Sequence, residues 1–323
     1  MGAIVLAQQG EGVARRRFMG VALALAIAAT LGGFLFAYAP NFFSVRNCLN
    51  VLIQGSSLGV MAIGLTFVMI VGGIDLSIPA TMAFAAVLGA FVMPVGGIIA
   101  GAATMLVSGL AVGAFNGVAV AWFEMTPFVV TLASMTVIGG ATVWMTNSQS
   151  LSDFPDRFFD LFLSAPAGIP VAVLILAVVA AIASLILTST AYGRSLYAVG
   201  LNAKAARLAR APVEWLLFST YAISGLLAGL AAVMLTARLG SASANLGSDG
   251  VVLDIVTACV VGGVSIYGGA GMATGAVLGA LFVTLISNSL NQLGVSYFMN
   301  LVVKGIAIIL FIWIDRISAR ASQ

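Results

Sequence analysis

Residues 168–190 have the sequence GIPVAVLILAVVAAIASLILTST, a run without a charged side chain. A helix rises about 1.5 Å per residue, so a helix of this length crosses the roughly 30 Å hydrocarbon core of a bilayer. We therefore expect a transmembrane helix here.

The rest of the chain has the same character. Of its 323 residues, 62% are hydrophobic and 7% are charged, and the mean hydropathy is +1.17. Soluble domains usually contain about 25% charged residues. No stretch is polar enough to form a separate soluble domain, so we expect residues 1–323 to form a single membrane domain.

Nine further apolar runs are long enough to cross a bilayer or nearly so. They are residues 18–38, 49–72, 78–93, 96–122, 127–146, 213–236, 251–266, 272–293 and 297–316. The predicted fold is therefore an all-α polytopic membrane protein of about ten transmembrane helices. The first run could also be a cleaved signal peptide, but it exceeds the usual core of about 7–15 residues, which favours an uncleaved helix.

Charge predicts the orientation of these spans, because loops rich in Lys and Arg stay in the cytoplasm. Arg15–Arg17 precede the first run, which predicts a cytoplasmic N-terminal tail at 1–17. Six spans then return the chain to the cytoplasm at the basic segment 193–214, and four more leave the C-terminus there. The loop 147–167 is expected outside. The net charge of +3 is explained by this bias, so no nucleic-acid partner is predicted.

Residue types that carry catalysis or bind metals are scarce. The chain has no histidine and only two cysteines, Cys48 and Cys259, without metal-ligand spacing. No metal site, catalytic residue or bound cofactor is expected, and an intramembrane enzyme has little support. The only lysines, Lys204 and Lys304, do not lie in a phosphate-binding P-loop motif. Energy for transport would then come from a partner.

An internal repeat links two parts of the sequence. Residues 71–90 and 261–280 match without gaps at eleven of twenty positions, beginning with Val-Gly-Gly in both copies. Internally repeated halves are typical of transporters, whose pathway lies between the repeats. The repeat therefore predicts transport.

The first copy contains Gly72, Gly73, Asp75 and Ser77, which together with Pro79 predict a break in helical structure. Asp75 could cap the following helix by accepting from its free amides. Alternatively, it could contact the solute or a gating partner, because ionisable residues within spans mark transport pathways.

Polar residues in the last two spans are further candidates for the pathway or its gate. Lys304 is expected to pair with Asp75 or Asp254 or to contact solute. Asn288 and Asn291 could bind a hydroxylated solute or form hydrogen bonds between helices. Glycines spaced by four residues, at 109–117, 225–229 and 271–279, predict close helix packing within the chain or in a dimer.

The basic segment 193–214 suits docking to another protein. Asn202 is predicted to cap a short helix with Leu201, Ala205, Leu208 and Ala209 on one side. The basic residues that border this ridge are Lys204, Arg207 and Arg210. An apolar ridge of this kind fits a groove in a partner. An ordinary positive loop is the alternative.

Several motifs in order resemble the permease subunit of bacterial ATP-binding cassette (ABC) importers for monosaccharides, of the ribose, xylose and galactofuranose type. They are GGIDLS at 72–77, TPFVVTL at 126–132, YGR at 192–194, YAVG at 197–200, Asn202 with AARL at 205–208, LDI at 253–255, GGVSIYGGAG at 262–271 and KG at 304–305.

The resemblance implies an inner-membrane permease that works as a dimer of two copies or of two homologous permeases. It also implies a periplasmic sugar-binding protein and a cytoplasmic ATP-binding subunit, which would bind ATP and Mg²⁺. Residues 200–212 would be the coupling loop, with contacts from Asn202, Lys204, Ala205, Arg207, Leu208 and Arg210. The expected function is sugar import by alternating access. The alternative is a self-sufficient secondary carrier or channel for a small polar solute.

Overall fold

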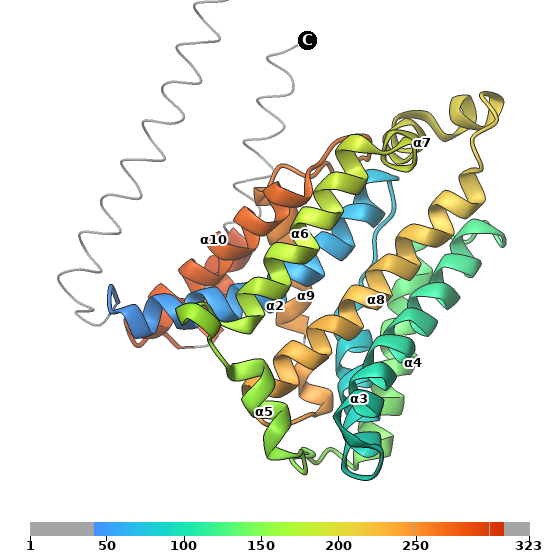
Figure 1. Cartoon of the computed structure of the whole chain (residues 1–323). Coiled ribbons are helices and arrows are strands. Elements are labelled where there is room, and N and C mark those ends of the chain that lie inside the picture. Colours follow the sequence, from blue (N-terminus) through green and yellow to red (C-terminus); the bar gives the residue numbers. More distant parts are fainter. Residues whose placement is uncertain (1–41, 248, 297, 307–323) are drawn as a thin grey trace, which may run out of the picture.

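A computed structural model describes residues 42–247, 249–296 and 298–306. Within these ranges the chain is a bundle of helices (Figure 1). The α-helices are α2 (Val45–Ile70), α3 (Ile78–Ala121), α4 (Pro127–Thr146), α5 (Asp156–Leu163), α6 (Val171–Ser189), α7 (Ala191–Leu208), α8 (Val213–Leu239), α9 (Asp249–Val261) and α10 (Ala273–Gln292). Two short 3₁₀ turns, η1 (Pro166–Gly168) and η2 (Ala244–Gly247), lie in the connections.

Six of these helices are long and apolar enough to cross a membrane: α2, α3, α4, α6, α8 and α10. The prediction of a multi-pass, all-α membrane protein is therefore confirmed. The predicted tail 1–17 and the span 18–38 lie outside the described residues, as does most of 297–316. The run 251–266 gives only α9, which has 13 residues. The count of ten spans remains a prediction.

Helix α3 consists of two antiparallel arms. Gly97, with φ of 81°, interrupts its helical backbone. A Cβ atom at Gly89 would collide with the side chain of Met105. In one continuous helix these two residues would be separated by about 24 Å. The chain therefore reverses near Gly97, and the arms correspond to the separate predicted runs 78–93 and 96–122.

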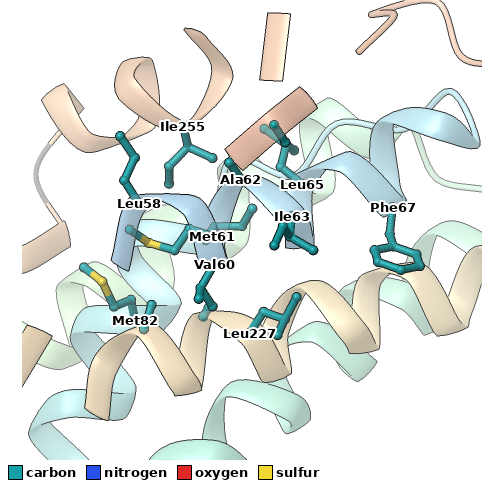
Figure 2. Close-up of a cluster of buried hydrophobic side chains, with 14 of the residues drawn as sticks. Leu58, Val60, Met61, Ala62, Ile63, Leu65, Phe67, Met82, Leu227 and Ile255 are labelled. Carbon is teal, nitrogen blue, oxygen red and sulfur yellow. The ribbon is translucent and has the colours of Figure 1, made fainter. Parts of the chain in front are cut away.

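Helix α2 lies at the centre of the bundle. Every residue of α2 from Gly55 to Ile70 is buried. Figure 2 shows this helix among side chains from its neighbours, including Met82 of α3, Leu227 of α8 and Ile255 of α9. A helix that is apolar on all sides belongs in such a core. The polar interruption after Ile70 is consequently placed deep in the protein.

The glycines spaced by four residues, at 109–117, 225–229 and 271–279, are called the glycine stripes below. They bring helices of this one chain together. On α3 and α8, Gly113 and Gly225 face each other so closely that a Cβ atom on either would meet the backbone of the other. Gly275 of α10 packs in the same way against Gly262. Small residues allow this approach between backbones. The stripes are thus used for packing inside the chain.

The connections separate into two ends of the bundle. Helix α8 begins beside α7 and ends beside α5, about 40 Å away along its axis (Figure 1). At the α5 end, backbone hydrogen bonds of 2.8 Å join Leu151 to Ala242. The segments 193–214 and 147–167 therefore lie at opposite ends, as the topology requires. Which end faces the cytoplasm remains a prediction.

Candidate functional site

The basic segment contains the predicted short helix. Backbone angles of −161° and 96° at Asn202 interrupt α7. The side-chain oxygen of Asn202 accepts a hydrogen bond from the N–H of Ala205 at 3.0 Å. This satisfies a free amide of the following turn, as an N-cap does. The predicted cap at Asn202 is confirmed, and residues 203–208 form a separate short helix.

This short helix presents the predicted ridge to its surroundings. Leu208 is 88% exposed and Leu201 is 75% exposed. Ala205, Lys204, Ala209 and Arg210 are exposed as well, whereas Ala206 is buried. Large exposed leucines rimmed by charges are typical of protein interaction sites. The surface formed by residues 201–210 is called the docking surface below.

One basic residue of the docking surface has a partner within the chain. Arg207 forms an ion pair of 2.6 Å with Glu214 at the start of α8. Both side chains are well exposed, so this pair contributes little to stability. It does hold the short helix against α8. Lys204 and Arg210 form no ion pair with any described residue.

The residues just before the docking surface pack between two loops. A Cβ atom at Gly200 would collide with the carbonyl oxygen of Ile70 and approach the amide of Gly269. That amide donates to the Ile70 carbonyl at 2.8 Å. A Cβ atom at Gly268 would lie 3.0 Å from both Gly72 and Gly200. These five residues form a glycine junction that joins α7 to both copies of the sequence repeat.

The two repeat copies share a local backbone structure. In each, a glycine with positive φ ends the helix, Gly72 at 82° after α2 and Gly263 at 80° after α9. In each, the next N–H donates at 2.9 Å to a carbonyl five residues earlier, Gly73 to Val68 and Val264 to Cys259. This pattern is a Schellman helix ending. The second copy ends one residue later, and duplication of whole halves remains a prediction.

Tyr197 adds a side-chain link to the second loop. Its hydroxyl donates a hydrogen bond of 2.7 Å to the carbonyl of Gly271. Desolvation by burial raises the pKa of this phenol above its usual value, so the proton that makes the bond is retained. The end of α7 is therefore fixed to the 262–271 loop from two sides.

Asp75 lies in a buried polar network. It is 3% exposed, and its Oδ1 accepts from the backbone N–H and the hydroxyl of Ser77, at 3.0 and 2.6 Å. Its Oδ2 accepts from Ser224 of α8 at 2.8 Å. Asn116 donates to Ser77 at 2.9 Å, and Ser134 of α4 donates to Asn116. Asp75 thus binds Ser77, the residue that precedes the first turn of α3, and α3 has no side-chain hydrogen bond to an amide of its first turn, so the predicted cap is not formed.

Lys304 pairs with Asp254 and not with Asp75. Its Nζ lies 2.8 Å from Oδ1 of Asp254, and both side chains are largely buried. Of the two partners that the sequence left open, the fold brings only Asp254 within reach. A buried ion pair of this kind contributes less to stability than its geometry suggests, because both charges lose water.

Breaking this pair on one side is expected to be costly. Replacing Lys304 with Met leaves the Asp254 carboxylate unpaired, so we expect Lys304→Met to lower stability by about 3 kcal/mol. The double variant Asp254→Leu with Lys304→Met should recover most of this loss. Thermal unfolding of the purified protein in detergent measures both. A double variant no more stable than Lys304→Met would contradict the assignment.

The two asparagines of α10 that the sequence indicated, Asn288 and Asn291, have different surroundings in the structure. Asn288 and Asn47 of α2 exchange hydrogen bonds of 2.8 and 3.0 Å, and Gln292 donates to Asn47 at 3.2 Å. Asn291 is exposed and makes no hydrogen bond to a described side chain. Asn288 therefore forms hydrogen bonds between α2 and α10, which is the second of the two roles that the sequence predicted for it.

A cavity that no sequence pattern predicted lies between α2, α8, α9 and α10. It has a volume of about 120 Å³, room for several water molecules. Its polar lining is formed by Gln54, Ser57, Arg238, Asp254, Thr284 and Ser287. The available signal was Arg238, an arginine two residues after the predicted span 213–236.

Comparisons with known proteins agree with this architecture. A family model described as "Branched-chain amino acid transport system / permease component" matches residues 47–312. The ribose import permease protein RbsC of Escherichia coli (strain K12) is 35% identical over 307 residues, which cover 93% of each chain. RbsC of Bacillus subtilis (strain 168) is 36% identical, covering 93% of this chain and 91% of its own.

A third relative has a different sugar in its name. The D-allose transport system permease protein AlsC of Escherichia coli (strain K12) is 33% identical over 304 residues, covering 93% of this chain and 92% of its own. No solved structure matches the chain. The matches extend over nearly the whole chain, including the docking surface and both repeat loops.

Proposed function

The chain belongs to the family of branched-chain amino acid transport system permease components, and from this we propose that it is the permease subunit of an ATP-driven, binding-protein-dependent importer that carries a monosaccharide into the cytoplasm. The resemblance to monosaccharide permeases that the motifs indicated is confirmed by the ribose and allose relatives. The observation that carries the proposal is that relatedness of about one third identity covers almost all of the chain.

The solute class follows from the relatives and not from the family description. The family model is named for amino acids, but the three relatives above are named for ribose or D-allose. Full-length relatedness to sugar permeases favours a monosaccharide as the solute. It also favours the importer over a self-sufficient secondary carrier or channel.

The proposed partners follow from the same relationship. A cytoplasmic ATP-binding subunit would contact the docking surface and bind ATP and Mg²⁺, because this chain has no P-loop sequence. A second permease, either another copy or a homologue, would complete the membrane part. A periplasmic binding protein would deliver the sugar. The protein would reside in the bacterial inner membrane with both termini in the cytoplasm.

The proposed mechanism is alternating access. Closure of the ATP-binding subunits would move the short helix 203–208, and the glycine junction would pass this movement to the loops 71–77 and 262–271. These loops follow α2 and α9, and they precede α3 and α10. Helices on both sides of the bundle would shift together, exposing the sugar to the cytoplasm. This chain makes or breaks no covalent bond in the cycle.

Reconstitution tests the proposed function directly. Proteoliposomes containing the permease and its ATP-binding subunit should take up radiolabelled D-ribose or D-allose only when ATP and the binding protein are both supplied. Uptake by the permease alone in response to an ion gradient would overturn the proposal in favour of the secondary carrier.

The docking surface gives a sharper prediction. Leu208→Asp places a charge on an exposed ridge that a partner must desolvate, so we expect loss of co-purification with the ATP-binding subunit and at least about a tenfold fall in uptake. Leu163→Asp is the matched control, because Leu163 is 52% exposed at the opposite end, on α5. Normal co-purification and uptake by Leu208→Asp would show that the ridge does not dock the subunit.

A further inference from the structure

The polar side chains of the cavity between α2, α8, α9 and α10 have few partners. Gln54, Ser57, Arg238 and Thr284 make no side-chain hydrogen bond or ion pair with any residue in the described part of the chain. Ser57 and Thr284 are nevertheless buried, at 3% and 2% exposure.

Other hydroxyls on the same helices behave differently. Ser56 and Thr66 of α2 donate to carbonyls four residues earlier at 2.7 Å, as Ser289 of α10 also does. Gln54 and Arg238 are half-buried, and all four side chains line the cavity. Polar groups from three helices are therefore free to form hydrogen bonds with a polar ligand in this one cavity.

The charge balance of the cavity selects among polar ligands. The carboxylate of Asp254 is already paired with Lys304. Arg238 therefore contributes the only unpaired charge among the described lining residues. A zwitterionic amino acid would need a free carboxylate for its ammonium group, and none is present in that lining. The charges therefore disfavour an amino acid.

The hydrogen-bonding groups match a neutral sugar. A guanidinium offers a planar set of donors that can hold two adjacent hydroxyls, while an amide and two hydroxyls can each donate and accept. Apolar side chains such as Leu58, Met61 and Leu235 complete the lining and can contact the C–H faces of a sugar ring.

The cavity also lies at the end of the bundle where solute would arrive. Arg238 is one residue from the end of α8, whose other end adjoins α7. Gln54 and Ser57 lie in the first half of α2, whose last residue, Ile70, belongs to the glycine junction. In the proposed orientation, this half of the bundle faces the periplasm.

We propose that this cavity is an outward-side binding site for a monosaccharide, with Arg238 as its main ligand and Gln54, Ser57 and Thr284 as further hydroxyl partners. The inference rests on the proposed function, because it assigns the solute site of that importer. Opening and closing of the site would involve the adjacent Asp254–Lys304 pair, which ties α9 to the helical segment 298–306.

Uptake kinetics test the site in the complete importer. Arg238→Gln should reduce uptake of radiolabelled D-ribose by about tenfold or more, the effect expected for losing hydrogen bonds from a charged group. The paired variant Ser57→Ala with Thr284→Val should give a smaller reduction of the same kind. Both should still co-purify with the ATP-binding subunit, so that a loss of uptake is not a loss of assembly.

Matched controls separate the site from general damage. Arg157→Gln changes an exposed arginine on α5, and Thr136→Val changes an exposed threonine on α4, so both should transport normally. If the wild-type importer does not transport the sugar, the proposed function fails. If the wild type transports and Arg238→Gln transports equally well, only the site assignment fails.

A labelling experiment gives a readout that does not depend on transport rate. In a Cys48→Ser background, which leaves only buried Cys259, Ser57→Cys should react with a small charged thiol reagent added from the outside. Ribose-loaded binding protein should slow this reaction, whereas the unloaded binding protein should not. Equal rates with loaded and unloaded binding protein would overturn the assignment.

Discussion

Gly225→Val is expected to abolish the folded protein. Gly225 lies where α8 crosses α3, and its missing Cβ would collide with the carbonyl oxygen of Gly109 and approach the backbone of Gly113. The obstacles are backbone atoms, which cannot rotate away as a flexible side chain would. Overpacking an interior costs about 1–3 kcal/mol even where neighbours can adjust, and here the two helices would have to separate along their whole contact.

The measurement is the yield of monodisperse protein after membrane extraction, with Gly140→Val as the control. Gly140 is an exposed glycine inside α4, and a Cβ added there meets nothing within 4 Å. Both substitutions place a β-branched residue in a helix, so the difference in yield isolates the packing at α3 and α8. Equal yields for Gly225→Val and Gly140→Val would mean that this helix crossing is not as close as the structure has it.

The glycine stripes show how far the sequence could predict the fold. Spacing by four residues indicated close packing, but not with which partner, because the pattern is the same for a contact within the chain and in a dimer. The fold resolves this through residues far apart in sequence, Gly113 with Gly225 and Gly262 with Gly275. The spacing of the glycines predicts which face of a helix packs closely, but only the tertiary structure shows which helix packs against that face.

Hydropathy did not predict where helix α9 ends. The run 251–266 is mostly apolar, so it was predicted as a span, but the helix ends at Val261 because Gly263 adopts a positive φ. Apolar composition does not distinguish a helix from an apolar loop that is buried in protein. By contrast, the separation of runs 78–93 and 96–122 was predicted correctly, since Pro94 and the following glycines interrupt the pattern.

The candidate site was only partly predictable for a similar reason. The cap at Asn202 depends on its immediate neighbours, and the sequence identified it. The partner of Lys304 depends on how α9 packs against the helical segment 298–306, and the sequence offered two carboxylates without a way to choose. The cavity around Arg238 draws on residues as distant as Gln54 and Thr284, which no local pattern connects.

Gly200→Ala is expected to separate ATP hydrolysis from transport. Alanine stabilises a helix by about 0.5–1 kcal/mol relative to glycine, so α7 itself should tolerate the change. The added Cβ, however, would collide with the carbonyl of Ile70, where the amide of Gly269 also binds. The end of α7 must then move away from both loops, which weakens the glycine junction while the exposed surface of residues 203–208 remains intact.

We therefore expect the Gly200→Ala importer to co-purify with its ATP-binding subunit and to hydrolyse ATP, while sugar uptake per ATP falls by about tenfold, within the range of typical coupling free energies. Gly139→Ala is the control, because a Cβ atom there meets nothing within 4 Å. Normal uptake by Gly200→Ala would show that the junction does not transmit the movement. Loss of co-purification together with uptake would instead show that the junction holds the docking surface in place. The ratio of uptake to ATP hydrolysis separates these outcomes, because only a coupling role lowers it in an assembled complex.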